Sequence, residues 1–444
     1  MADIKIIKKN EAMIRIECDA GISRELAEQF TFDVPGAKFT PTYKNGRWDG
    51  KIRLYSYMAR ETYHGLSDDI EKFAQRFDYT VENTLQPDGK DVTQEGVKIF
   101  MDSLKFGLPE GASINPYQYE SVYQMLKNDR LLLVSPTSSG KSMMIASLVR
   151  WHQQQNRRSL VITPTISLVD QMFGDFDDYF SKNGWKSKDN CYKIKAGIEK
   201  QTDFPIVIST WQSLQNVDKD YFNQFDCIIV DEAHTAKAKT ITGIMCAATN
   251  VKYRYGCTGS LDKTETNELV LRGLFGKIFR SITTQQLIKN KQISGLNIKC
   301  MFMQYADEDK KKVIAGDYKQ EIDFLVNSTR RNKFISKLAI SCEKNTLVLF
   351  NFRSHGQAIF DLINSRITDD RKVFFIHGGV DGDTREEIRK IVESEHHTVI
   401  LSFNKKQIRC TADQLIPLSD GTTKIAKTIN ENDDICDIWI KSKT

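Results

Sequence analysis

Short apolar runs alternate with longer amphipathic stretches through the middle of the chain. Each run holds four to six residues and leads into a polar or glycine-containing string, as buried strands of a parallel sheet do. The stretches between them are long enough for helices, so the pattern predicts a doubly wound α/β domain over residues 96–290. Its predicted strands are LLLV (131–134), SLVIT (159–163), IVIS (206–209), CIIV (227–230) and YRYGCT (253–258).

A second series of the same kind occupies residues 291–402 and opens with the segment 296–304. It alternates again between helical and strand patterns, which predicts a second βαβ domain. The predicted helices lie around 329–343, 356–363 and 384–393, and the predicted strands are TLVLF (346–350), VFFI (373–376) and TVILS (398–402).

Residues 1–95 precede both series and predict a separable, small α/β domain. Between Tyr43 and Tyr55, four basic residues oppose only Asp49, and aromatic residues are interleaved with them. Gly46 and Gly50 predict a hairpin that presents the aromatic rings. Cations for phosphates beside flat rings for bases are typical of a nucleic-acid surface; the alternative is a hairpin whose Trp48 packs on its own core. The candidate contacts are Lys44, Arg47, Trp48, Lys51 and Arg53.

Composition narrows the class of protein. The 444 residues carry a net charge of +5, which permits nucleic-acid binding without demonstrating it. No apolar run approaches the roughly 18 residues of a membrane span, so we expect no membrane association. Nine cysteines occur without a CxxC pair, which indicates reduced thiols in a cytoplasm and argues against a zinc ribbon or a disulfide framework.

The string SPTSSGKS follows the first predicted strand directly and predicts a phosphate-binding loop. Small residues ending in Lys-Ser wrap phosphates with backbone N–H groups at a helix N-terminus. Ser135 and Ser138 depart from the strict GxxxxGK[ST] pattern, but both are small enough for the backbone to approach phosphate. Lys141 would reach the β and γ phosphates, and Ser142 would hold Mg²⁺. The predicted nucleotide-binding residues are Ser135, Pro136, Thr137, Ser138, Ser139, Gly140, Lys141 and Ser142.

The string DEAH follows the fourth predicted strand and supplies the acidic partner. Asp231 would hold the same Mg²⁺, Glu232 would polarise the attacking water, and His234 completes the string. The alternative is a polar turn beside an unrelated acidic cluster. In this order and spacing, the two strings predict a site for ATP and Mg²⁺, with Lys141, Asp231, Glu232 and His234 as its catalytic set.

Further strings at strand ends make the chain resemble the superfamily 2 helicases, which have two RecA-like domains. They are NPYQYE (115–120), PTISLVDQ (164–171), STWQSL (209–214), TGS (258–260), STRRNKFI (328–335), FNFRSHGQA (350–358) and IHGGV (376–380). Taken singly, each is equally an ordinary cap or turn. The resemblance implies that Gln118 reads adenine and that Thr258, Gly259 and Ser260 couple nucleotide state to DNA contact. It also implies DNA contacts at Thr165, Gln171, Thr210, Gln212, Ser354 and His355.

A closer resemblance is to the UvsW family of phage recombination helicases. It rests on the basic W-D-G segment, the T-G-S string, and the stretches RNKFI (331–335) and SHGQAIFDLI (354–363). The resemblance implies an ATP-dependent motor that remodels branched DNA, including forks, junctions and R-loops with their RNA–DNA hybrids. It further implies a monomeric phage protein in the bacterial cytoplasm, with single-stranded-DNA-binding or recombination proteins as partners.

After residue 402 the expected glycine-bearing motif V and the arginine motif Q-x-x-G-R-x-x-R do not follow. Residues 403–444 instead resemble an intein block B, with Thr411 on its threonine, Gln414 in place of its histidine and Asp433-Asp434 near its acidic pair. The alternative is a divergent β-rich tail. We therefore expect an incomplete second RecA-like domain, and a chain that binds ATP and DNA but unwinds little. A catalytically weak binding fragment and an RNA helicase remain alternative functions.

Overall fold

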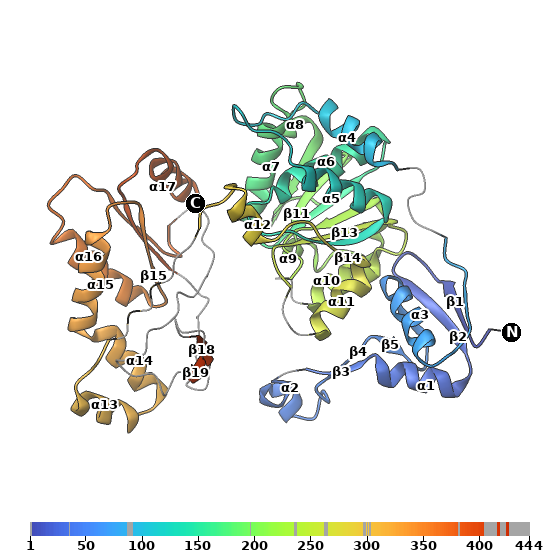
Figure 1. The fold of residues 1–444 in the computed structure, drawn as a ribbon, viewed down its shortest axis with the longest axis horizontal. Helices are drawn as coiled ribbons and strands as arrows, with labels where there is room; N and C mark the ends of the chain where they lie inside the picture. Colours follow the sequence, from blue (N-terminus) through green and yellow to red (C-terminus); the bar gives the residue numbers. More distant parts are fainter. Residues whose placement is uncertain are drawn as a thin grey trace. The chain divides into compact units, whose positions relative to one another are not determined.

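The computed structural model divides into two compact units, residues 1–294 and a unit that begins at Gly295 (Figure 1). The structure describes residues 2–34, 36–86, 92–195, 197–234, 238–261, 265–295, 299, 301, 303–380, 382–403, 415–417 and 423–425. In the described residues, no helix combines the length and apolar character needed to cross a membrane.

The N-terminal part of the first unit is a five-stranded sheet with two helices. Its strand order is β5-β6-β2-β1-β7, in which β1 and β2 pair antiparallel with Ile6 opposite Ile16. Alternate apolar residues of these two strands are buried, as in a sheet with one face on a core. The elements are β1 (Ile4–Lys8), β2 (Met13–Cys18), α1 (Ala20–Gln29), β5 (Tyr55–Ser56), β6 (Glu61–Tyr63), α3 (Ser67–Arg76) and β7 (Val81–Asn83).

The hairpin predicted over Tyr43–Tyr55 is wrong. Thr40 caps a short helix, α2 (Pro41–Lys44), whose Pro41 stands at a position that favours proline because no helical N–H is needed there. The chain then returns through β4 (Lys51–Arg53), which pairs with β3 (Thr31–Asp33) and not with a strand near residue 43. Residues 34–50, which we call the basic loop, therefore contain η1 (Ala37–Phe39) and α2 between two strands of a short ribbon.

The second part of the first unit is a seven-stranded parallel sheet in the order β10-β11-β9-β12-β13-β8-β14. All five predicted strands are present, and β10 and β14 extend the sheet at its two edges. Neighbouring side chains of one strand enter two different apolar clusters, so both faces are covered. The strands are β8 (Arg130–Val134), β9 (Ser159–Thr163), β10 (Cys191–Ile194), β11 (Ile206–Thr210), β12 (Cys227–Val230), β13 (Tyr253–Thr258) and β14 (Lys277–Arg280). The helices are α4 (Gln94–Ser103), α5 (Pro116–Lys127), α6 (Lys141–Gln154), α7 (Ile166–Phe180), α8 (Ser187–Asn190), α9 (Trp211–Leu214), α10 (Ala238–Ala247), α11 (Glu265–Phe275) and α12 (Thr284–Lys289).

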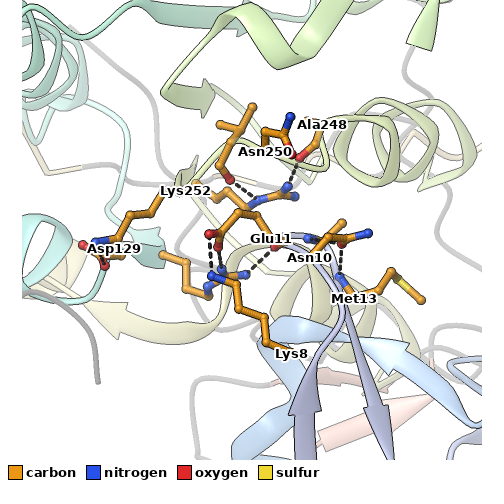
Figure 2. Close-up of polar contacts among 12 residues, drawn as sticks. Lys8, Asn10, Glu11, Met13, Asp129, Ala248, Asn250 and Lys252 are labelled. Carbon is orange, nitrogen blue, oxygen red and sulfur yellow. Dashed lines mark hydrogen bonds and ion pairs between the residues drawn. The ribbon is translucent and has the colours of Figure 1, made fainter. Parts of the chain in front are cut away.

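The N-terminal sheet is docked on the amino-terminal edge of the parallel sheet. Figure 2 shows Glu11, in the β1–β2 turn, among residues that precede β8 and β13. Its backbone N–H donates to the Thr249 carbonyl at 2.9 Å, and its carboxylate accepts from Arg130 at 3.0 Å. Nearby, the buried Arg254 donates to the Met245 carbonyl in α10 and to the Val251 carbonyl after it, and Lys252 pairs with Asp129 at 3.0 Å. The two sheets thus share one apolar cluster and one polar contact region.

The second unit is built on a three-stranded parallel sheet in the order β15-β17-β16. Each of its three strands was predicted, and helices α15 and α16 pack on it through Ile359, Ile363 and Ala339. Its elements are α13 (Asp307–Ile314), α14 (Tyr318–Asn327), α15 (Thr329–Ser341), β15 (Thr346–Phe350), α16 (Arg353–Asn364), β16 (Val373–Ile376), α17 (Gly382–Ser394) and β17 (Val399–Phe403).

Beyond residue 403 the structure describes two short strands, β18 (Leu415–Pro417) and β19 (Thr423–Ile425), which pair antiparallel. The intein-like positions Thr411, Gln414, Asp433 and Asp434 lie outside the described residues.

Candidate ATP and nucleic-acid site

The phosphate-binding loop lies between the end of β8 and the start of α6. Gly140 has a φ of 84° and precedes the helix, and a Cβ there would lie 2.3 Å from the Gln118 amide nitrogen. Ser138 also has a positive φ, 65°, although it is not glycine. A left-handed serine costs on the order of 1 kcal/mol, and such strain concentrates at functional sites. The loop is therefore held in one shape that exposes its backbone.

Buried serines brace this loop from below. The Ser135 hydroxyl lies 2.6 Å from the hydroxyls of Ser139 and Ser281, and Ser139 donates to the Pro136 carbonyl at 2.6 Å. Hydrogen bonding satisfies these buried polar groups, which explains why serine stands where glycine or alanine is usual. Ser281 follows β14, a strand that the sequence pattern did not predict, so this brace was missed.

Lys141 joins the loop to the DEAH string. Its Nζ donates to the carbonyls of Ser135 and Pro136 at 3.2 and 3.4 Å and lies 3.8 Å from Glu232 Oε1. The side chain is largely buried, so its positive charge is directed into the site. The structure thus brings together the phosphate-binding lysine and the catalytic carboxylate predicted from sequence.

His234 connects the DEAH string to the T-G-S loop. Its Nδ1 lies 3.4 Å from Glu232 Oε2 and 2.6 Å from the Thr258 hydroxyl, which in turn donates to the Ser260 carbonyl at 2.8 Å. Glu232 has a φ of 47°, another strained non-glycine residue. Gly259 lies against the phosphate-binding loop, since a Cβ there would be 3.6 Å from Lys141 Nζ. The predicted coupling residues are therefore in contact with the nucleotide edge.

Gln118 contacts the phosphate-binding loop through protein groups. Its amide donates to the Ser139 carbonyl at 2.9 Å, and its Oε1 accepts from the Asn115 N–H at 2.8 Å in a capping box that begins α5. Tyr117 donates to the same Ser139 carbonyl at 3.0 Å. The Asn115 side-chain amide also lies 3.5 Å from Gln118 Oε1, so Gln118 is held at the loop by protein groups and its contact with adenine stays a prediction.

The donor set fits Mg²⁺. Ser142 lies in the first turn of α6 and Asp231 follows β12 directly, so a hydroxyl and a carboxylate come from the carboxyl edge of the same sheet. Magnesium prefers such oxygen ligands and keeps several waters. The backbone N–H of Asp231 donates to the Ile162 carbonyl at 2.8 Å, which fixes the start of the DEAH loop.

A groove of about 500 Å³ lies at the same edge of the sheet. Thr165 caps α7 and Thr210 caps α9, and Gln212 donates to the Pro164 carbonyl at 3.2 Å. Gln171 is exposed but lies outside the lining. The groove is lined by Pro164, Thr165, Ile166, Lys195, Gly197, Lys200, Thr210, Gln212, Ser213 and Asn216.

Lys195 and Lys200 of this groove were missed by sequence reasoning. They follow β10, whose polar residues concealed the strand. The sequence feature that could have identified this basic region is the pair of alternating lysines, Lys193 and Lys195, near the other loops predicted at strand ends. Asp170 forms ion pairs with Lys193 at 2.9 Å and with Lys195 at 2.8 Å, which orients both lysines beside the groove.

In the second unit, the two residues predicted to contact nucleic acid lie in different environments. Ser354 is exposed at the start of α16. His355 is 8% exposed, and its Nε2 lies 2.9 Å from the Asn332 amide oxygen. Burial, with the charge of Arg331, lowers the pKa of His355. The ring joins α16 to α15, and its contact with nucleic acid stays a prediction.

The basic loop, together with β4 and β5 that follow it, presents only part of the predicted surface. Lys44, Arg47 and Lys51 are exposed, whereas Trp48 is half-buried and donates to the Lys51 carbonyl at 2.9 Å. Arg53 pairs with Asp49 and holds the pKa of that carboxyl below its usual value. Tyr55 is buried and lies 2.8 Å from the Ser23 hydroxyl, so it cannot face a ligand. A neighbouring groove of about 490 Å³ is lined by Arg24, Ala27, Glu28, Thr31, Lys51, Arg53 and Tyr57.

Comparison with known proteins identifies the family of this chain. A profile described as the N-terminal domain of the DNA helicase UvsW matches residues 3–83, and one described as the res subunit of type III restriction enzymes matches residues 111–261. The ATP-dependent DNA helicase uvsW of Enterobacteria phage T4 is 34% identical over 416 residues, which cover 90% of this chain and 80% of that protein. The chain belongs to the UvsW family of DNA helicases.

Solved structures agree with this membership. The crystal structure of T4 UvsW has a TM-score of 0.58 and 32% identity, covering 90% of this chain and 80% of that one. A second T4 UvsW crystal structure has a TM-score of 0.56 and 31% identity over 63% of this chain. The DNA 3'-5' translocase XPB2 of Sulfurisphaera tokodaii is 25% identical over 285 residues. The family resemblance and the α/β fold with a RecA-like parallel sheet, both predicted from sequence, are confirmed for this UvsW-family chain.

Proposed function

We propose that this chain is an ATP-dependent DNA helicase that remodels branched DNA, including forks, junctions and R-loops. One observation carries the proposal. Lys141, Glu232, His234 and Thr258 form a continuous set of contacts from the phosphate-binding loop to the T-G-S loop. A groove lined in part by the half-buried Lys195 and Lys200 lies at the same sheet edge, so a change at the nucleotide can reach a bound strand through a few contacts.

Each residue has a defined task in this mechanism. The loop backbone and Lys141 bind the phosphates, while Ser142 and Asp231 would hold Mg²⁺, which neutralises developing charge on the phosphoryl oxygens. Glu232 orients the attacking water. His234, placed between Glu232 and Thr258, transmits the state of that carboxylate to the T-G-S loop.

The DNA contacts belong to the backbone of one strand. Lys195 and Lys200 neutralise phosphates, and Thr165 and Gln212 offer groups that bond phosphate without reading sequence, as a translocating protein requires. The Thr210 hydroxyl accepts from the Ser213 N–H and also lies 3.0 Å from the Ser213 hydroxyl, so we assign Thr210 to shaping the groove. The basic loop and its neighbouring groove hold the branched part of the substrate.

We place this activity in the cytoplasm of a bacterial host, in a monomeric phage protein that works beside single-stranded-DNA-binding or recombination proteins. The T4 relative, named as an ATP-dependent DNA helicase, supports the enzymatic part of the proposal.

Replacement of Lys141 by alanine tests the proposal. We expect loss of nucleotide binding and of any ATP hydrolysis, with DNA binding retained, because the groove does not use Lys141. Calorimetry with ATP and Mg²⁺ and anisotropy with forked DNA measure the two properties. Lys182→Ala, at an exposed lysine of the same domain, is the matched control. Unchanged ATP binding in Lys141→Ala would refute the assignment of the site.

A further inference from the structure

The basic loop has a fixed internal structure. The Val34 N–H donates to the Gly50 carbonyl at 2.8 Å, and the Thr40 hydroxyl donates to the Ala37 carbonyl at 2.7 Å. Ala37 is buried against Gly50, where a Cβ would lie 3.0 Å from the Ala37 methyl group. Gly50 also has a φ of 79°, so another residue at this position would have an unfavourable backbone conformation and too little space for its Cβ. Side chains that this loop turns outward are therefore presented on a firm support.

The outward position of the Phe39 side chain is not explained by packing within the loop. Phe39 ends η1, its N–H donates to the Gly36 carbonyl at 3.0 Å, and its side chain is 82% exposed. Covering an exposed phenylalanine ring removes apolar surface from water and is therefore favourable. One exposed apolar residue is ordinary on a protein surface, so its meaning depends on its neighbours.

Those neighbours are cationic. Lys38, Lys44 and Arg47 are exposed, and within the described part of the chain none of them forms an ion pair. Arg53 differs, because Asp49 already neutralises it. The loop thus combines three uncompensated positive charges with one fully presented aromatic ring. An anionic ligand that also offers flat apolar faces matches both features.

We propose that Phe39 stacks on an unpaired base at the branch point of DNA, while Lys38, Lys44 and Arg47 bind the flanking phosphates. The proposal rests on the proposed DNA-binding function of the basic loop and names the residue that recognises the branch. Every base has a face that an aromatic ring can cover, whereas a closed duplex already stacks those faces. Phe39 therefore distinguishes a branch from a continuous duplex, and the cations bind both.

The experiment uses the full chain and DNA carrying 2-aminopurine either at the unpaired position of a fork or inside a duplex. Stacking changes 2-aminopurine fluorescence, so we expect a signal from the fork with the unmodified chain. Phe39→Ala should remove that signal and lower fork affinity about tenfold, while changing duplex affinity less than twofold. Phe39→Tyr should keep both. Ile99→Ala removes an exposed apolar side chain from α4 and is the matched control.

The outcomes separate this inference from the function on which it rests. Equal fork affinity and fluorescence in the unmodified chain and in Phe39→Ala would overturn the stacking proposal. A second variant, Lys44→Glu with Arg47→Glu, addresses the loop itself and should weaken fork and duplex binding alike. If that variant binds both DNAs normally, the DNA-binding function of the loop fails together with the stacking proposal. If it binds weakly while Phe39→Ala does not, only the stacking proposal fails.

Discussion

The two parallel sheets of this chain differ in how their faces are covered. In the first sheet, Leu160 and Ile162 of β9 enter the cluster shared with the N-terminal sheet, and Val161 enters the cluster on the opposite face. In the second sheet, Val348 and Phe350 of β15 face the helices, whereas Leu347 and Leu349 are 58% and 55% exposed. Parallel sheets normally have both faces buried.

We relate this difference in coverage to two tasks of a helicase, which are nucleotide binding and nucleotide turnover. The first sheet is enclosed on both faces and supported at its amino-terminal edge by Glu11, so its opposite edge can hold a strained phosphate-binding loop. The second sheet has a small core, and its edge strand β15 exposes the side chains of one face. We therefore expect nucleotide binding to be a property of the first unit, and turnover to be limited by what the second unit contributes.

The largest expected effect concerns turnover. An arginine finger contributes about 10³–10⁵ in rate to phosphoryl transfer, and after Ser402 the sequence contains a single arginine, Arg409, which lies outside the described residues. We expect residues 1–444, expressed as one chain, to bind ATP yet hydrolyse it at least about 10³-fold more slowly than T4 UvsW assayed beside it. Phosphate release with and without single-stranded DNA measures this. DNA-stimulated hydrolysis at the T4 rate would contradict the division of tasks.

The next effect tests the coverage of the two sheets directly. Ile208→Ala removes a fully buried side chain from β11 and should lower the free energy of unfolding of the first unit by about 3 kcal/mol. Leu349→Ala, in the exposed face of β15, should change the second unit by less than about 1 kcal/mol. Urea unfolding, followed separately for the two transitions, measures both. Similar losses in the two units would show that the second face is covered in solution.

The sequence predicted the strands of the first sheet because central parallel strands are uninterrupted apolar runs. It missed β10 and β14 because edge strands such as CYKI and KIFR carry polar residues. These two omissions also concealed functional groups, since Lys195 follows β10 and Ser281 follows β14. Functional residues at the sheet edge were therefore predictable only where the strand that precedes them could be recognised in the sequence.

Two differences between the structure and the sequence-based picture of the candidate site have local causes. The glycines of the basic loop indicated a hairpin, but Thr40-Pro41 is a helix start, and the helix it begins displaces the turn. His355 follows a strand closely enough to resemble a loop contact. However, α16 begins at Arg353, and its first turn directs the imidazole to Asn332. In both cases an early helix start changed which side chains face outward.

The support beneath the first sheet gives the third prediction. Glu11→Gln removes the carboxylate charge that pairs with the mostly buried Arg130 at 3.0 Å and lies close to Lys8. Because breaking a buried pair costs more than the pair contributes, we expect a loss of about 2 kcal/mol in the first unit. Glu82→Gln, in the exposed pair with Lys5, is the matched control and should cost under about 1 kcal/mol. Equal effects would show that the docked sheet does not depend on Glu11.

The smallest expected effect is the share of the first unit's pH dependence that comes from His152. His152 is fully buried beside the rings of Tyr253 and Tyr255, and burial lowers its pKa to about 3. The unfolded chain binds this proton near pH 6.5, so the stabilisation is complete above that pH and is lost progressively as pH falls from about 6.5 toward 3. At pH 5.5 the cost relative to pH 7 is about 1 kcal/mol. His152→Phe should remove that increment from the first-unit transition and leave the second-unit transition unchanged, as measured by urea unfolding at the two pH values. An identical pH dependence in the variant would mean that the buried imidazole does not set the acid sensitivity of the enclosed sheet.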